Sequence, residues 1–240
     1  MKIDKIYYIN LDYRTDKRNW MDSQLTSINI PHERFSAITP TIESLTDKDG
    51  QYHDFYTRLP LKHKSPRWEI GTVGCYLSHL TIHKLAHERN FGNYIILEDD
   101  CIFSQKSLNI INENLNNGMI GDDWDMIRST WFSHPDEIFK YDYCAPSSKF
   151  YTKLCEPNIR RRAEFVRTKY GKWIKNSLVA ASCGGTHFQL IKKSSISKII
   201  KYLDDDHVLP IDMLYTTNAL NVYDSKFGIR SNGNFSSDIH

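Results

Sequence analysis

Short apolar runs alternate along the chain with longer stretches in which apolar residues recur at helical spacing. Lys5–Leu11 and Tyr94–Leu97 are rich in isoleucine and tyrosine and predict buried strands. Phe35–Ile38 is a further apolar run, and we interpret Trp124–Ile127 and the end of Ser182–Ile191 as strands. Strands separated by helical stretches indicate an α/β fold.

Helices are expected where the apolar spacing approaches 3.6 residues. These stretches are Thr15–Ile28, the segment from Gly71 to a turn at Asn90–Asn93, Ser194–Leu203, and a segment that begins at Pro210. Thr39–Pro66 is polar, and we expect a long ordered loop or a short helical insert there. We expect the basic stretch 149–175 to be irregular.

Composition narrows the class of protein. The 240 residues are 40% hydrophobic and 25% charged, which is typical of a globular protein, and we expect one domain over residues 1–240. No apolar run approaches the roughly 20 residues that cross a bilayer, and Met1–Asp4 opens no secretory signal. We therefore expect a cytoplasmic protein, with peripheral membrane contact as an open alternative.

Charge is balanced overall but uneven along the chain. The net charge of +2 does not indicate a nucleic-acid partner. Residues 149–175 hold nine basic and two acidic side chains, so this window carries +7 and the remainder −5. A solvated basic face, a site for an anionic glycan or lipid headgroup, and contact with a membrane surface all fit this window and stay open.

Several common motifs are absent from the sequence. There is no G-x-x-x-x-G-K-[ST] loop, no G-x-G-x-x-G fingerprint and no G-x-S-x-G elbow, so P-loop, Rossmann and serine-hydrolase chemistry lose support. The five cysteines are widely spaced and form no C-x-x-C pair. We interpret them as free thiols in a reducing compartment.

Three acidic residues, Glu98, Asp99 and Asp100, directly follow the strand Tyr94–Leu97. Ligands of open α/β sheets bind at the carboxyl ends of the strands. Neighbouring carboxylates repel one another unless a cation lies among them, and an extended backbone points Glu98 and Asp100 to one side and Asp99 to the other. The triplet predicts a divalent metal site, with a solvated acidic loop as the alternative.

Two other polar patterns point to structural roles. Asp204–Asp206 follows a helix, and we expect a solvated helix end there. His79, His83 and His87 recur every four residues and share one helix face, but no H-E-x-x-H order or matching carboxylate accompanies them. We expect a polar helix face rather than a zinc site.

Five separated segments share their order and spacing with one known family. They are Ile9-Asn-Leu-Asp-Tyr-Arg14 continuing to Asp16 and Arg18, Glu69–His79, Leu97–Asp100, Gly185-Thr186, and Pro210-Ile-Asp212. Together they resemble glycosyltransferase family 25, which contains bacterial lipooligosaccharide galactosyltransferases and collagen hydroxylysine galactosyltransferases. The resemblance spans nearly the whole chain.

This resemblance implies a GT-A-like α/β/α fold with a central, mostly parallel sheet, a UDP-sugar donor, and a Mn²⁺ or Mg²⁺ ion. It implies transfer, with inversion, of galactose from UDP-galactose, or of glucose from UDP-glucose, to a hydroxyl of a glycan, a lipid-linked saccharide or a protein. The alternatives that stay open are a metal-dependent phosphoester hydrolase and a non-catalytic module that binds nucleotide sugars or glycans.

The resemblance also assigns roles to individual residues. Asp100 and Glu98 are expected to hold the metal, with His240 as a further ligand. The expected donor-binding residues are Asn10, Leu11, Arg14, Arg18, Ser78, His79, Glu98, Asp99, Gly185 and Thr186. Asp212 is expected to accept the proton of the acceptor hydroxyl. Structural alternatives stay open for some of these residues, namely surface charge for Arg18, a tight turn at Gly185, helix stabilisation by Asp212 and a frayed end at His240.

Overall fold

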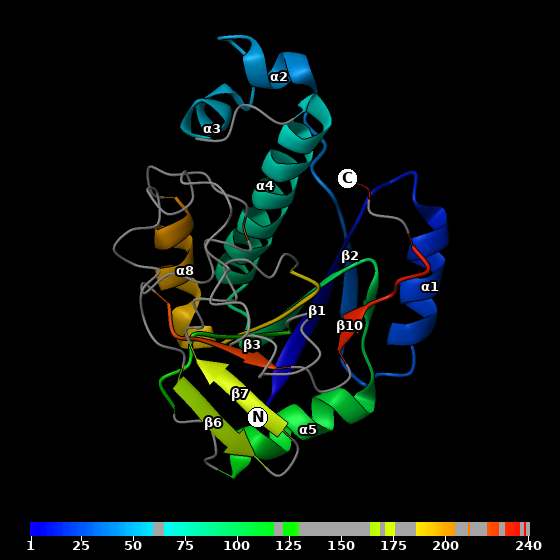
Figure 1. The fold of residues 1–240 in the computed structure, drawn as a ribbon, viewed down its shortest axis with the longest axis vertical. Coiled ribbons are helices and arrows are strands. Elements are labelled where there is room, and N and C mark those ends of the chain that lie inside the picture. Colours follow the sequence, from blue (N-terminus) through cyan, green and yellow to red (C-terminus); the bar gives the residue numbers. More distant parts are fainter. Residues whose placement is uncertain are drawn as a thin grey trace.

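The computed structural model of the protein describes residues 1–59, 65–117, 122–129, 164–168, 171–175, 186–204, 211, 220–225, 229–235 and 238. Its centre is an eight-stranded sheet with the order β2-β1-β3-β8-β5-β9-β7-β6 (Figure 1). The strands are β1 (Ile3–Asn10), β2 (His32–Ser36), β3 (Asn93–Glu98), β5 (Met126–Ser129), β6 (Glu164–Thr168), β7 (Gly171–Lys175), β8 (Phe188–Ile191) and β9 (Val222–Ser225). A two-stranded ribbon pairs β4 (Cys101–Ile102) with β10 (Arg230–Ser231).

Most strands of the large sheet run in one direction. β1 is parallel to β2 and β3, and β5 is parallel to β9, whereas β8 is antiparallel to both β3 and β5. β7 is antiparallel to β9 and to β6. Six of the eight described strands therefore share a direction, with β7 and β8 opposed, which confirms the expected α/β fold with a mostly parallel sheet.

Helices cover both faces of this sheet. They are α1 (Thr15–Leu25), α2 (Ile42–Thr46), α3 (His53–Arg58), α4 (Pro66–Glu88), α5 (Gln105–Asn116), the short 3-10 turn η3 (Lys193–Ser195) and α8 (Ile196–Leu203). Within the described residues, no helix is both long enough and apolar enough to span a bilayer.

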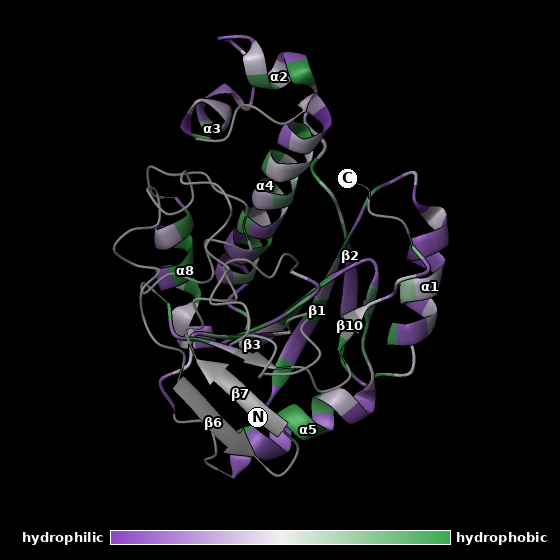
Figure 2. Cartoon of the chain, viewed as in Figure 1, coloured by the Kyte–Doolittle hydropathy of each residue, from purple (hydrophilic) through white to green (hydrophobic). Residues whose placement is uncertain are grey.

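The residues of β3 explain the layered arrangement. Tyr94 and Ile96 belong to the core cluster that contains the buried residues of α4 and α8, and Ile95 and Leu97 belong to the cluster that contains those of α1 and α5. Because successive side chains of a strand point to opposite faces, one continuous apolar run fills both cores. The helices are apolar only in part, and α1 is largely hydrophilic (Figure 2).

Helix α4 is the longest described helix, and clear capping signals mark its ends. The Ser65 side chain accepts a hydrogen bond from the Trp68 amide (3.2 Å), and Pro66 occupies the first turn. Beyond Glu88, Asn90 adopts a φ of 52°, a left-handed conformation that commonly ends helices. The expected start at Gly71 is therefore too late, because that expectation overlooked the Ser65-Pro66 cap.

Two further segments refine the expectations. The insert Thr39–Pro66 contains the short helices α2 and α3, which confirms the helical alternative for its described part. The stretch 149–175, expected to be irregular, contains the antiparallel hairpin of β6 and β7. Its aromatic and β-branched residues favour strands, but the many charges between them conceal this pattern. The rest of this stretch, and with it the expected membrane or glycan contact, lies outside the described residues.

Helix α5 was not expected from the sequence, although the signals are present. The Ser104 side chain accepts a hydrogen bond from the Ser107 amide (3.2 Å) and caps the helix. Leu108 and Ile111 then follow at helical spacing and are buried. The strand β4 and the cap of α5 come directly after the acid triplet and hold the carboxyl end of β3 in place.

Candidate metal and substrate site

A pocket of about 460 Å³ opens where β1 and β3 end. Asn10 and Leu11 line it from the end of β1, and Glu98, Asp99 and Asp100 line it from the end of β3. Helix α4 and the loop after β2 complete the walls. The pocket therefore lies at the carboxyl edge of parallel strands, the position that the acid triplet predicts.

Two acids of the triplet gather around one histidine. His187 Nδ1 lies 3.2 Å from Glu98 Oε2 and 3.4 Å from Asp100 Oδ1. One ligand atom from each of these three side chains lies within 4.8 Å of the other two. We call Glu98, Asp100 and His187 the acid cluster.

The protonation states in the acid cluster depend on these contacts. Burial would raise the pKa of Glu98, but the neighbouring His187 and His79 side chains hold that pKa well below its usual range. Burial would lower the pKa of His187, but Asp100 and Glu98 raise it to about 10. The His187 side chain is therefore a cation between two carboxylates, where a metal ion would place its own positive charge.

Strand pairing brings His187 to this position. The antiparallel register of β8 against β3 pairs Phe188 with Leu97, and the Glu98 amide donates to the His187 carbonyl at 3.1 Å. The start of β8 consequently lies beside the end of β3. The Thr186 hydroxyl donates to Glu98 Oε1, so the same short segment binds both oxygens of this carboxylate.

Asp99 faces the other way. Its Oδ2 accepts a hydrogen bond from Asn10 Nδ2 (2.9 Å), and its Oδ1 accepts one from Lys17 Nζ (3.0 Å). Burial raises the pKa of Asp99 despite the opposing effect of Lys17 and Asn10. The expected alternation is confirmed, because Glu98 and Asp100 meet His187 while Asp99 meets Lys17.

Asn10 and Ser78 are largely occupied by structural contacts. Asn10 Oδ1 accepts from Arg34 Nε (2.9 Å), so this side chain links Arg34 to Asp99. Ser78 Oγ accepts from the Ile38 amide (2.9 Å). At Gly74 a Cβ would lie 2.4 Å from the Ile38 carbonyl oxygen, so only glycine permits this approach of α4 to the loop after β2. Asn10 and Ser78 therefore line the pocket and also hold its walls in place.

The histidines of α4 differ from one another in their surroundings. His79 is buried and lines the pocket, with its Nε2 4.0 Å from Glu98 Oε1 and its Nδ1 3.2 Å from Gln189 Nε2. His83 is also buried, and only His87 is exposed. The expected polar helix face was therefore wrong for His79 and His83, because the side of α4 that carries them packs against the sheet rather than facing water.

The chemistry of the donor groups fits a divalent cation. Two carboxylates and one imidazole are ligands that Mn²⁺ accepts, and Mg²⁺ prefers the carboxylates. A second group, Cys75, His79 and Glu98, also brings three ligand atoms within 4.8 Å of one another. Its thiol makes it a softer set that suits Zn²⁺ better than Mn²⁺ or Mg²⁺. Within the part of the chain that the structure describes, neither group includes His83 or His87.

The remaining expected site residues divide into three groups. Leu11 and Thr186 lie at the pocket or against its acids. Arg14 binds Asp238, which lines the pocket, whereas Arg18 has a half-exposed side chain whose Nε lies 4.0 Å from Asp22 Oδ2. Gly185, Asp212 and His240 lie outside the described residues.

Comparison with known proteins identifies the family. The model of glycosyltransferase family 25 (LPS biosynthesis protein) matches residues 3–215. The chain belongs to this family.

Relatives of this family 25 chain are considerably longer than it is. It is 25% identical to procollagen galactosyltransferase 1-A of Xenopus laevis over 244 aligned residues, which cover 96% of this chain and 34% of the relative. It is 28% identical to a glycosyltransferase 25 family member of Drosophila melanogaster over 123 residues, which cover 48% of this chain and 20% of the relative. The chain thus spans between a fifth and a third of the length of these two relatives.

Among solved structures, a glycosyltransferase involved in the glycosylation of the major capsid of PBCV-1 aligns with 83% of this family 25 chain and 64% of that chain. Its TM-score is 0.34 and its sequence identity is 9%, values too low to support an argument.

Three side chains at the site of this family 25 member were missed in the sequence. His187 directly follows the expected Thr186 and precedes an apolar strand. This position could have placed it among the expected site residues. Lys17 lies on the first turn of α1 and has no local pattern that separates it from other helical lysines. Asp238 reaches the pocket from 221 residues further along the chain than Lys17, a contact that no local pattern predicts.

Proposed function

We propose that this chain is a metal-dependent glycosyltransferase that transfers galactose from UDP-galactose, with inversion, to a hydroxyl of a glycan or a protein. Membership of family 25 supports the reaction class, and its likeness to a longer procollagen galactosyltransferase supports galactose as the sugar. UDP-glucose is the second donor that a test must include.

The acid cluster is the observation that carries this proposal. Glu98, Asp100 and His187 offer ligand atoms within 4.8 Å of one another beside a pocket of about 460 Å³, a volume suited to a small-molecule ligand. A bound Mn²⁺ or Mg²⁺ would neutralise the negative charge that develops on the departing diphosphate. An acidic surface loop without a ligand would not need a partner strand to supply a buried threonine and a histidine to its carboxylates.

The surrounding residues would fix the geometry of the metal ligands. The Thr186 hydroxyl donates to Glu98 Oε1, and Ser231 Oγ donates to Asp100 Oδ2 at 2.6 Å. Such partners of ligating carboxylates keep them in one orientation. Asp99 is held away from the acid cluster by Asn10 and Lys17, and we propose that it shapes the donor pocket instead of holding the metal.

The attacking hydroxyl needs a base to take its proton. Asp212, expected for this role, lies outside the described residues, and its assignment stays a proposal on the family resemblance.

UDP release from purified protein tests the function. A panel of UDP-galactose, UDP-glucose and other nucleotide sugars is assayed with Mn²⁺ or with EDTA, first without and then with glycan and peptide acceptors. We expect Mn²⁺-dependent release from UDP-galactose that EDTA abolishes. Release of phosphate from simple phosphoesters would favour a hydrolase, and metal-dependent UDP binding without any turnover would favour a non-catalytic module.

A further inference from the structure

A second charged group lies in the same pocket, on the side of Asp99. Both carboxylate oxygens of Asp238 accept hydrogen bonds from Arg14 Nη1, at 2.6 and 2.7 Å. Lys17 Nζ donates to Asp238 Oδ2 at 2.7 Å, and Arg67 Nη2 donates to the Asp238 carbonyl at 3.3 Å. We call Arg14, Lys17 and Arg67 the basic cluster. Asp238, Lys17 and Arg67 all line the pocket.

The charges of this group balance only when Asp238 is present. Lys17 is buried between Asp99 and Asp238, and Arg14 is shared between Asp238 and Asp16. Burial would raise the pKa of Asp238, but Lys17 and Arg14 lower it, so the carboxylate is ionised. Without this carboxylate, Lys17 would keep Asp99 as its anionic partner and Arg14 would keep only the largely exposed Asp16. An anion at this position therefore completes the pairing of Lys17 and Arg14.

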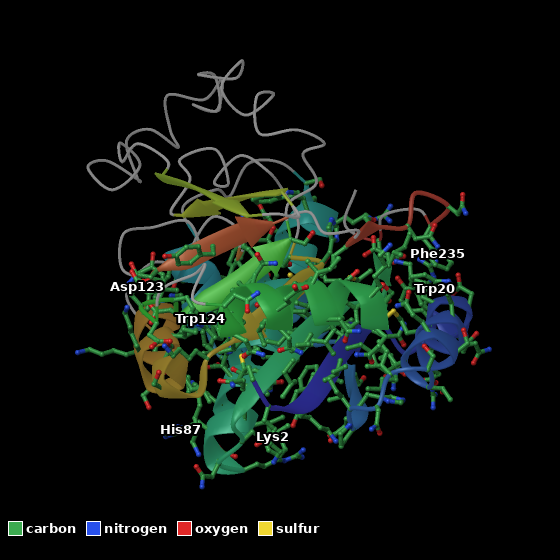
Figure 3. All side chains as sticks on the ribbon, turned by 90° about the horizontal axis from the view of Figure 1, so that it is seen from below. Lys2, Trp20, His87, Asp123, Trp124 and Phe235 are labelled. Atoms are coloured by element: carbon green, nitrogen blue, oxygen red, sulfur yellow. The ribbon has the colours of Figure 1, made fainter. Side chains whose placement is uncertain are left out.

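The segment before Asp238 is anchored by contacts that do not involve Arg14 or Arg67, although Lys17 Nζ also lies 5.8 Å from the centre of the Phe235 ring. The Asn232 amide donates to the Asp100 carbonyl at 2.7 Å, and the ring of Phe235 lies 5.3 Å from that of Trp20 on α1. Trp20 and Phe235 are labelled close to each other in the view from below (Figure 3). These contacts hold the chain near the pocket without using Arg14 or Arg67. The ionic contacts of the Asp238 carboxylate therefore come in addition to the contacts of Asn232 and Phe235.

A carboxylate and a phosphate bind guanidinium and ammonium groups through the same kind of charge-assisted hydrogen bond. Asp238 thus lies where an anionic group of a ligand in this pocket would find its best partners. The acid cluster, which suits a cation, lies on the opposite side of Asp99 in the same pocket.

We propose that the basic cluster is an oxyanion subsite and that Asp238 is its internal occupant, displaced when an anionic group of a substrate enters the pocket. The inference rests on the proposed function only for the origin of that anion, which is either the diphosphate of the donor or an acidic group of the acceptor. An internal occupant lowers the apparent affinity for the ligand in proportion to the time it fills the subsite.

Isothermal titration of the full chain with inorganic pyrophosphate, in EDTA, measures the subsite without metal or transfer. Asp238→Asn keeps the shape of the side chain and removes its charge. We expect this variant to bind pyrophosphate about tenfold more tightly than the wild type, within the range of ordinary coupling between competing groups. Asp16→Asn is the matched control, because it removes a carboxylate from the same Arg14 guanidinium on its exposed side. That control should stay within about twofold of the wild type, as expected for a screened surface charge.

The outcomes separate cleanly. Equal tightening in Asp16→Asn and Asp238→Asn would reduce the effect to net charge, and unchanged or weaker binding in Asp238→Asn would make Asp238 a structural clamp; either result overturns the proposal. Asp238→Ser is a second variant, and loss of folding in both, seen as loss of the cooperative thermal transition, would also overturn it.

Two further ligands then identify the source of the anion. If Asp238→Asn tightens the binding of UDP as it does that of pyrophosphate, the subsite serves the donor. If the binding of a sugar phosphate tightens in this variant while the binding of UDP does not, the subsite serves an acidic acceptor. Failure of the proposed transferase activity would appear in the UDP-release assay and would leave these metal-free titrations unaffected, so the two failures are distinguishable.

Discussion

The acid cluster and the basic cluster lie on two sides of one short acidic segment, and the partners of each carboxylate set the charge of each side. Glu98 and Asp100 surround His187, whereas Asp99, between them in sequence, faces Lys17. One side consequently has two carboxylates and an imidazole that could hold a metal ion once the imidazole gives up its proton, and the other has cations whose carboxylate partner could exchange for a ligand anion. A metal–diphosphate complex carries both charges, and a pocket with both sides is suited to it.

The largest expected effect comes from a substitution in the acid cluster. Asp100→Asn removes a charged ligand while keeping the side-chain shape, and we expect Mn²⁺-dependent turnover to fall by about 100-fold or more, as for the loss of one preorganised electrostatic contact. Mn²⁺ binding, followed by electron paramagnetic resonance, should weaken with it. Asp204→Asn is the control, since Asp204 is a half-exposed helix-end acid that binds Lys84. Turnover within about threefold of the wild type for Asp100→Asn would remove the acid cluster from the mechanism.

The next largest effect comes from a substitution in the basic cluster. Lys17 Nζ and Lys84 Nζ each lie 3.0 Å from an aspartate oxygen, but their side chains are 4% and 44% exposed. Lys17→Met removes the buried cation that Asp99 and Asp238 share and should lower the free energy of unfolding by about 3 kcal/mol. Lys84→Met should change it by less than about 1 kcal/mol. Urea unfolding of both variants measures the difference, and equal losses would show that the burial of Lys17 has no energetic consequence.

Local sequence patterns were sufficient to predict the carboxylates of the acid cluster. The change from an apolar strand to three acids is contiguous, and it predicted both a group of possible metal-ligating side chains at a sheet edge and the alternation of Asp99 against its neighbours. The helices α1, α4 and α8 and the strands β1 and β3 were likewise expected, because each carries its own apolar spacing.

The partners of these carboxylates and the basic cluster depend on contacts between segments that are distant in the sequence. Glu98 and His187 are 89 residues apart, and Lys17 and Asp238 are 221 residues apart, so their meeting follows from strand order and from the anchoring of the last described segment. A lysine on a helix or an aspartate in a polar stretch has no local feature that reveals such a partner. Burial reversed the expectation for His79 and His83 for the same reason.

A smaller effect sharpens the role of the residues that support the acid cluster. Thr186 donates its hydroxyl to Glu98 and is buried. Thr186→Val keeps the shape and removes the donor, and we expect Mn²⁺ affinity to fall by about tenfold, as for other partners of metal ligands. Pyrophosphate binding in EDTA should not change, because Thr186 has no contact with the basic cluster. Thr57→Val, at an exposed threonine that bonds only within α3, is the matched control. Parallel losses of both ligands would indicate a general disturbance of the pocket.

The smallest effect concerns His83, the buried histidine of α4 that contacts Tyr94. His83 is buried on α4, its Nδ1 lies 2.5 Å from the Tyr94 hydroxyl, and burial, with a smaller effect of His79, lowers its pKa to about 3. An unfolded histidine has a pKa of about 6.5, so below that pH the unfolded chain binds a proton that the folded chain does not. Stability should therefore be complete above pH 6.5 and fall as the pH drops, by about 1 kcal/mol between pH 6.5 and 5.5. His83→Gln should remove this part of the slope whatever its effect on absolute stability. Coincident slopes for the two proteins would mean that burial does not keep His83 neutral in the fold.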